Sequence, residues 1–399
     1  AISLPNLFKI NLKKMKRINN LWLLIFGAIL ISCNDETTDN VDPVVTVTPP
    51  ATYSFERNGQ TTVSYGGQTS RLEMAKELGS HLNDETKTKE QLVNMFDNGT
   101  GFDNSSLDGS GKKIGNKTAS SSIASSTVKA QFNALIDDVV TNVFPAVASS
   151  TDASAGTAGI YTDPGDGGRT VKINAKGHEI NQLFVKGLMG ALICDQIIWG
   201  YLSAGKLDGG TNVADNDAGT LVDGKNYTQM EHYWDEGFGY LYGMDTDISN
   251  SSIEGSDVLV SKYLKKVDAS SLPGIAQRIY DAFKHGRAAI VAGNYTVRDE
   301  QAEIVKHELS NVIGRKAADY LRSTASEIND GKWANAHHAL SEGWGFILSL
   351  QFTKNTQTGS PYYTNSEVNS MLADIDDFWT VTPATLESMA SSIESKFGF

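Results

Sequence analysis

One pattern that combines metal-binding and charge-binding side chains occurs twice in this sequence. It reads His-x-x-x-Glu-Gly-aromatic-Gly-aromatic and covers residues 232–240 and 338–346. Side chains four residues apart on a helix lie on one face, so each His/Glu pair can contact one ligand or hold its two members together. Imidazole and carboxylate groups suit iron or zinc. The candidate ligand or metal residues are therefore His232, Glu236, His338 and Glu342.

The two pairs allow three interpretations. They bind a metal or another ligand, they brace the fold through a buried Glu–His contact, or they catalyse a metal-dependent hydrolysis together. The repetition indicates an old internal duplication. If the two motif helices pack about a twofold axis, the four side chains come together. The glycines after each glutamate lack side chains, so another helix can approach closely there.

A weaker repeat lies upstream of each motif, at His178-Glu179 and His307-Glu308. Adjacent residues sit about 100° apart on a helix and do not share a face, so structural roles are expected. The zinc motif His-Glu-x-x-His is absent, because Gln182 and Asn311 occupy the position of its second histidine. The aromatic residues near these motifs are expected in the core: Trp199, Tyr201, Trp234, Phe238, Trp344 and Phe346.

The N-terminus has the pattern of a bacterial lipoprotein signal. A basic start at 15–17 is followed by the hydrophobic run 21–31 and by Leu30-Ile31-Ser32-Cys33. Such a run is too short to span a bilayer. Residues 1–32 are therefore interpreted as an upstream segment and signal peptide, and Cys33 as the lipidated residue. Asn34 rather than aspartate follows, and Asp35 and Glu36 come next, which favours the outer membrane and its outer face.

Composition restricts the function of the remaining body. The chain has 34 Lys and Arg against 47 Asp and Glu, a formal net charge of −13, and residues 1–32 contribute only basic side chains to it. An acidic body without a basic cluster argues against nucleic-acid binding. Cys194 is the only cysteine besides Cys33, and its apolar surroundings predict a core position.

The spacing of apolar residues predicts an all-α fold of long helices. Residues 33–52 are interpreted as the lipidated cysteine with a flexible tether, and 53–399 as a helical body with halves 53–255 and 256–399. Aspartate-rich runs at 163–168 and 215–217 lack the spacing of an EF-hand, so turns are favoured over calcium sites. Helices are predicted around 72–82 and at 91–96, 127–144, 177–202, 226–242, 275–292, 298–323, 333–352 and 384–397, with loops at 97–116, 151–170, 207–224 and 244–256.

With these motifs assembled, the chain resembles a family of exported bacterial lipoproteins that carries an uncharacterised-domain label. The resemblance extends from Tyr53 to Phe399 and is clearest at 63–72, 186–191, 230–240, 284–290 and 338–342. More remotely, the chain is similar to imelysin-like proteins, helical two-lobed lipoproteins associated with iron uptake. Their Gly-x-His-x-x-Glu signature is shifted here, because His178 follows Gly177 directly.

These observations favour a non-enzymatic lipoprotein of the outer membrane or cell surface. It is expected to bind a ligand or partner in iron or nutrient acquisition, with iron or zinc as candidate cofactors. A metal-dependent hydrolase that uses His232, Glu236, His338 and Glu342 is the first alternative. The second is a structural accessory subunit of an outer-membrane transporter, in which the pairs only brace the fold.

Overall fold

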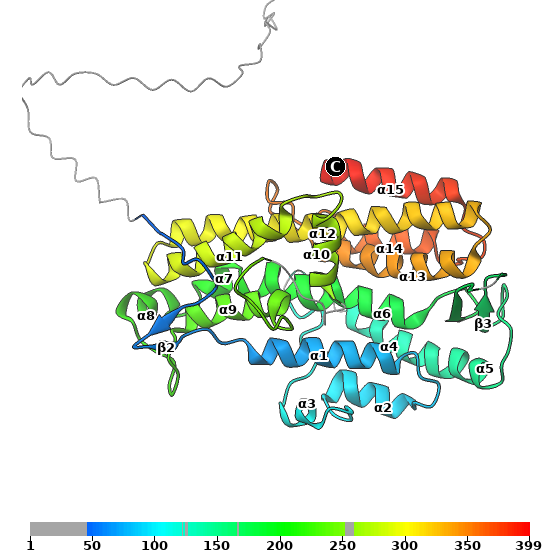
Figure 1. The fold of residues 1–399 in the computed structure, drawn as a ribbon, viewed down its shortest axis with the longest axis horizontal. Helices are drawn as coiled ribbons and strands as arrows, with labels where there is room; N and C mark the ends of the chain where they lie inside the picture. The colour runs from blue at the N-terminus through cyan, green and yellow to red at the C-terminus, as the bar shows by residue number, and fades with distance from the viewer. Residues whose placement is uncertain (1–45, 122, 124–126, 166, 252–258) are drawn as a thin grey trace, which may run out of the picture. The chain divides into compact units, whose positions relative to one another are not determined.

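The computed structural model describes residues 46–121, 123, 127–165, 167–251 and 259–399. The predicted signal peptide, Cys33 and the first part of the tether lie outside the described residues. The regular secondary structure of the described body is almost all helical, which confirms the predicted fold class (Figure 1). The elements that position the functional side chains are therefore helices and the turns between them.

The α-helices are α1 Gly66–His81, α2 Lys89–Val93, α3 Ser105–Gly109, α4 Val128–Asp138, α5 Phe144–Ala148, α6 Ile180–Leu188, α7 Ala204–Leu207, α8 Asn212–Ala218, α9 Gln229–Tyr242, α10 Val260–Asp268, α11 Ile275–Val291, α12 Tyr295–Asn329, α13 Trp333–Ser349, α14 Asn365–Asp374 and α15 Pro383–Phe397. The π-helical segments are η1 Asn94–Asn98, η2 Val139–Val143 and η3 Met189–Tyr201, and η4 Leu350–Phe352 is a 3₁₀ turn. Two antiparallel hairpins pair β1 Glu56–Arg57 with β2 Gln60–Thr61, and β3 Gly159–Thr162 with β4 Thr170–Ile173.

Helices α6 and η3 form one continuous helix, Ile180–Tyr201, as the apolar run at 177–202 predicts. It is long and apolar enough to cross a membrane, but 89% of its most apolar window is buried inside the body, as in the core helix of a globular protein. Helix α13 packs along both segments, mainly along α6, and α9 packs along η3. Cys194 lies in η3 and is fully buried, as predicted, and burial raises the pKa of its thiol.

The longest helix, α12, packs against α11, α13 and α15 (Figure 1). The side chain of Asn294 begins it by accepting a hydrogen bond from the backbone N–H of Val297 at 3.1 Å. At its other end Gly331 adopts a positive φ of 74°, which allows the tight turn into α13. The prediction of 298–323 was shorter than the helix, because the terminal turns of α12 are more polar than its middle.

A buried ionic network ties the N-terminal segment to α9 and α11. Arg287 of α11 is fully buried and donates to Asp235 at 3.0 Å and to Glu231 at 3.1 Å, both on α9. It also donates to the hydroxyl of Thr62 at 2.9 Å. The hydroxyl of Tyr53 donates to Asp235 at 2.7 Å. These bonds hold the segment from Tyr53 to Thr62 beside the first motif helix.

Several elements differ from the sequence-based expectation. The predicted loops 97–116, 151–170 and 207–224 contain α3, β3 and α8, and helices α10 and α14 were not predicted. Helix α8 has no buried residue, so it lacks the apolar stripe by which helices are recognised in a sequence. The aspartate run at 163–168 helps to begin α13, because the Asp163 carboxylate accepts the N–H groups of Ala334 and Asn335 at 2.7 and 3.1 Å.

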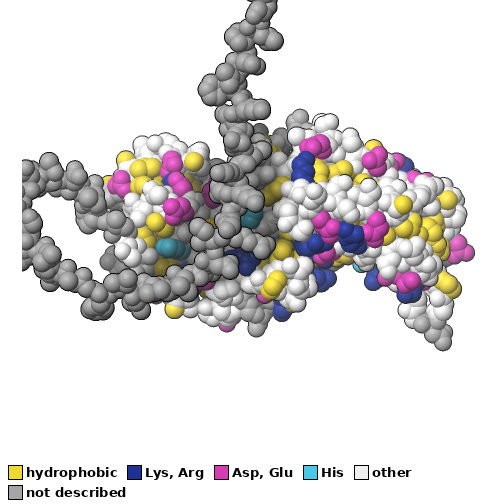
Figure 2. Space-filling view, turned by 90° about the horizontal axis from the view of Figure 1, so that it is seen from above, with side chains coloured by type: hydrophobic (Ala, Val, Ile, Leu, Met, Phe, Trp, Pro, Cys, Tyr) yellow, Lys and Arg dark blue, Asp and Glu magenta, His cyan; other side chains and the backbone are white. Residues whose placement is uncertain are grey.

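The surface mixes both signs of charge. On the face shown in Figure 2, acidic and basic side chains lie next to one another among hydrophobic ones. Ion pairs of this kind join α12 to α15, where Arg315 and Arg322 both contact Glu394. Opposite charges on this face therefore largely compensate one another.

Candidate ligand-binding site

The two His/Glu pairs have the same local geometry on different helices. In the first pair, on α9, Nε2 of His232 lies 3.9 Å from Oε2 of Glu236. In the second pair, on α13, Nε2 of His338 lies 3.7 Å from Oε2 of Glu342. The helical spacing therefore places each histidine against its own glutamate, as the sequence predicts.

The first pair is held by donors from two other helices. Oε1 of Glu236 accepts hydrogen bonds from the side-chain amide of Gln68 at 2.9 Å and from the hydroxyl of Tyr201 at 3.2 Å. The ring of Tyr227 stacks on the imidazole of His232, with ring centroids 4.5 Å apart. Tyr201 is buried in the core, as expected, and its hydroxyl also fixes the candidate carboxylate. The expectation of a core position also holds for Trp234, Phe238 and Phe346, which are fully buried, whereas Trp199 and Trp344 are partly buried and pack against the core.

The second pair is enclosed by charged partners. Oε1 of Glu342 accepts from the hydroxyl of Tyr263 at 2.9 Å and lies 3.2 Å from the ammonium of Lys186. Nδ1 of His338 lies 2.6 Å from Oε2 of Glu179. Burial alone would raise the pKa of the Glu342 carboxyl, but Lys186 and His338 outweigh it and hold that pKa at about 2. The second pair is thus part of a closed, internally compensated ionic group.

The two pairs do not come together, so the motif helices lack the twofold packing that would have joined them. The first pair contacts Tyr201 at the end of η3, whereas the second contacts Lys186 in α6. These partners are about four turns apart on one helix, roughly 20 Å at a rise of about 1.5 Å per residue. Each pair must therefore be interpreted as a separate site.

A cavity of about 460 Å³ opens beside the first pair. We call it the cationic cavity, because three basic side chains and one carboxylate line it. Burial, together with repulsion from Arg71, lowers the pKa of the Lys117 ammonium, as expected where cations share poorly hydrated space. The lining residues are Ser64, Gly66, Gly67, Gln68, Arg71, Lys112, Lys117, Tyr201, Tyr227, His232 and Glu236.

The first turn of α1 adds positive potential to this cavity. The N-cap residue Tyr65 provides no side-chain hydrogen bond to that turn, and two glycines, Gly66 and Gly67, follow it. N–H groups at a helix start carry partial positive charge and bind anions, and glycines let a ligand approach them. One turn later, Arg71 is 6% exposed, and its Nε donates to the carbonyl of Lys113 at 2.9 Å. The guanidinium is thus held in place at the cavity.

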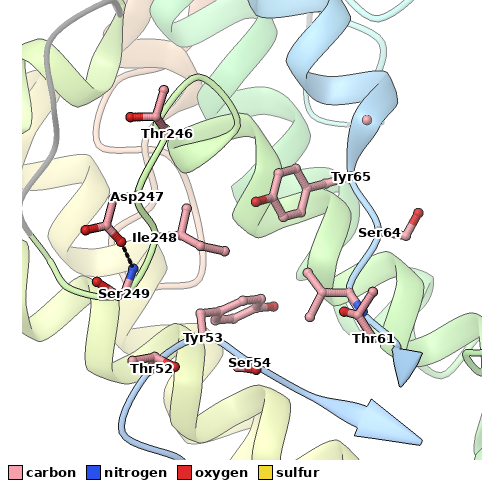
Figure 3. A pocket seen from close by; sticks show the side chains of 12 residues that line it. Thr52, Tyr53, Ser54, Thr61, Ser64, Tyr65, Thr246, Asp247, Ile248 and Ser249 are labelled. Carbon is pink, nitrogen blue, oxygen red and sulfur yellow. Dashed lines mark hydrogen bonds between the residues drawn. The ribbon is translucent and has the colours of Figure 1, made fainter. Parts of the chain in front are cut away.

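A second cavity, of about 650 Å³, shares the lining residues Ser64 and Gly66 with the cationic cavity (Figure 3). Aromatic rings and hydroxyls line most of it, and Tyr65 and Ile248 extend into it in this view. Asp247 is its one charged residue, and its carboxylate accepts the N–H of Ser249 at 2.8 Å. This cavity lacks the cluster of charges that distinguishes its neighbour.

Among the described residues, one group has ligand atoms close enough for a metal ion. It comprises Glu77 and His81 of α1 with Asp103. Nε2 of His81 lies 3.1 Å from Asp103 and 4.0 Å from Glu77. This group contains none of the four residues predicted as metal ligands. The spacing of Glu77 and His81 was visible in the sequence, but Asp103 comes from a loop whose position was not predictable.

The other sequence candidates have structural partners. His178 contacts the carbonyl of Asp376 at 2.8 Å through Nε2. His307 contacts the amide of Asn311 at 3.1 Å. Sequence reasoning missed Gln68, Arg71, Lys112 and Lys117. A signal for part of this set was present, because two glycines at a helix start with an arginine one turn later are typical of an anion site.

The comparisons with known proteins give a family and no described activity. A family model described as a domain of unknown function, DUF4856, matches residues 50–399. No curated protein and no solved structure matches the chain.

Proposed function

We propose that this chain, a member of the DUF4856 family, binds a small anion in the cationic cavity. One observation carries the proposal: Arg71, Lys112 and Lys117 and the start of α1 surround a space that holds a single carboxylate, Glu236. In a protein with a net charge of −13, such a local excess of cations needs a compensating anion. The volume of the cavity suits a small molecule.

Binding explains the site better than hydrolysis by the four motif residues. A shared metal centre would require both His/Glu pairs within one coordination sphere. They lie roughly 20 Å apart along the continuous helix formed by α6 and η3. In the first pair, Gln68 and Tyr201 both occupy the same oxygen of Glu236, which orients the carboxylate. Fixed donors and cations around a cavity favour recognition of a charged ligand.

We further propose that the protein acts from the outer membrane, anchored through a lipid on Cys33 and displayed at the cell surface. There it would pass an anionic nutrient, including an iron complex of an organic acid, to a transporter partner. The support is the signal-like segment before Cys33 and the tether after it. Replacing Cys33 with serine should abolish incorporation of labelled fatty acid and release the protein from the membrane fraction. Unchanged membrane association would contradict the proposed anchor.

Calorimetric titration of residues 46–399 with citrate and, separately, inorganic phosphate tests the binding site. We expect at least one anion to bind, and Lys112→Gln and Lys117→Gln to weaken it by about tenfold each through loss of a charged contact. The control is Lys89→Gln, because Lys89 pairs with Asp137 outside the cavity. Equal affinity in all four proteins would place binding elsewhere. If neither anion bound, the accessory-subunit alternative would be favoured.

A further inference from the structure

The surroundings of the second His/Glu pair include a carboxylate beside the histidine that the first His/Glu pair does not have. Both glutamates accept a tyrosine hydroxyl and a nitrogen donor on Oε1, and both face their histidine through Oε2. The His–Glu separations, 3.9 and 3.7 Å, differ by a few tenths of an ångström. The environments of the two pairs can therefore be compared position by position.

The neighbouring helices can be aligned through hydrogen bonds made at matching positions of the two motifs. In the first motif, Gly243 comes four residues after Gly239, and its carbonyl accepts a hydrogen bond from the hydroxyl of Thr69 of α1 at 2.8 Å. In the second motif, Ser349 comes four residues after Gly345, and its hydroxyl accepts a hydrogen bond from the N–H of Gly190 of η3 at 3.0 Å. This matches Thr69 with Gly190, and three residues earlier it matches Gly66 with Gly187.

The two helices begin at different points of this alignment. Helix α1 begins at Gly66, whereas α6 already has seven helical residues, 180–186, before Gly187. Those extra turns pass beside the second pair, and their N-cap residue Glu179 contacts His338. Beside the first pair no helical turn of α1 fills the corresponding place, and the cationic cavity lies there.

The missing turns leave one histidine nitrogen unpaired. Nδ1 of His338 is paired with the Glu179 carboxylate at 2.6 Å. Nδ1 of His232 is buried and has no hydrogen-bond partner among the residues that the structure describes. A buried polar atom without a partner costs about 1–3 kcal/mol, so an incoming acceptor is favoured there. Tyr227 stacks on the face of this imidazole, and both residues line the cavity.

We infer that the ligand of the cationic cavity is a small di- or tricarboxylate, one of whose carboxylates takes the place that Glu179 has beside His338. This inference rests on the proposed function and names its ligand class. That carboxylate accepts a hydrogen bond from Nδ1 of His232 once the side chains that bury this atom have shifted. Arg71, Lys112 and Lys117 exceed Glu236 by two positive charges, which matches a ligand with at least two carboxylates.

Titration of residues 46–399 with succinate, citrate and inorganic phosphate tests the ligand class. Succinate or citrate should bind more tightly than phosphate, and His232→Leu should weaken the carboxylate by about tenfold. The matched control is His307→Leu, because His307 contacts Asn311 on α12 and does not line the cavity. It should leave the affinity unchanged.

The other possible results refute different parts of the proposal. Phosphate binding without carboxylate binding would refute the ligand class and leave the proposed anion site standing. Carboxylate binding that His232→Leu does not weaken would refute the comparison with Glu179. If none of the three probes bound, both the inference and the proposed function would be wrong.

Chemical rescue in the second pair gives an independent measurement if His232→Leu does not fold. Glu179→Ala removes the carboxylate from His338, and sodium formate should then raise the melting temperature of this variant more than that of the wild type. Sodium chloride at the same ionic strength is the control for screening. Equal responses to formate and chloride would show that this place beside the histidine does not select a carboxylate.

Discussion

Oε2 of Glu179 lies 2.6 Å from Nδ1 of His338, so the residue that begins α6 and the second motif belong to one ionic group. The backbone N–H of Glu179 also donates to the hydroxyl of Ser341 on α13, at 2.9 Å. On the other side of the imidazole, Glu342 lies near Lys186. Carboxylate, imidazole, carboxylate and ammonium thus follow one another between α6 and α13.

Lys186→Met should strongly destabilise the fold. The substitution leaves Glu342 buried without its main cation, and breaking a buried ion pair on one side costs about 3–5 kcal/mol. The double variant Lys186→Met/Glu342→Gln should recover a substantial part of that loss, because no uncompensated charge remains. Urea unfolding of the three proteins measures the effect. If both variants lost the same stability, the cost would come from packing and not from charge.

Arg287→Met tests the network that holds the N-terminal segment. Asp235 and Glu231 would lose their shared buried cation, and we expect a loss of about 3–5 kcal/mol in the free energy of unfolding. Arg322→Gln is the control, because the Arg322 side chain is 37% exposed and its ion pairs are screened by water. It should cost no more than about 1 kcal/mol. A similar loss in both variants would contradict the importance of burial.

The sequence predicted the helices whose apolar stripe is continuous, including the central one and both motif helices. It did not predict α8, which buries nothing, or the positions of Arg71, Lys112 and Lys117 beside Glu236. These basic residues reach the cavity from another helix and from the segment that follows α3, and nothing in their spacing encodes that meeting. Local spacing predicted each His/Glu contact, whereas tertiary packing decided that the two pairs stay apart.

Gly239→Ala should destabilise the fold at the first motif. A Cβ at this position would lie 2.3 Å from Cβ of Tyr65, which cannot move without its backbone. Overpacking of this kind costs about 1–3 kcal/mol. Gly205→Ala is the matched control in α7, where a Cβ would have no neighbour within 4 Å. Its stability should stay equal or rise slightly, because alanine favours a helix. Equal behaviour of the two variants in urea unfolding would refute this close approach.

His337 should make the fold sensitive to acid. Burial, with a smaller contribution from the neighbouring His178, lowers the pKa of the His337 imidazole to about 4. An unfolded histidine has a pKa of about 6.5, so below that pH the unfolded chain binds a proton that the folded protein excludes. Stability from this group is complete above pH ~6.5 and is lost as the pH falls toward 4, by at most about 1.4 kcal/mol per pH unit.

His337→Phe keeps an aromatic ring beside Trp379, whose ring centroid lies 4.3 Å from that of His337, and removes the titrating group. The free energy of unfolding should therefore fall less steeply between pH 6.5 and 4 in this variant than in the wild type. Other groups, such as Glu342, titrate in both proteins, so the difference between the two curves isolates His337. Parallel curves for the wild type and His337→Phe would show that His337 is not the acid-sensitive group.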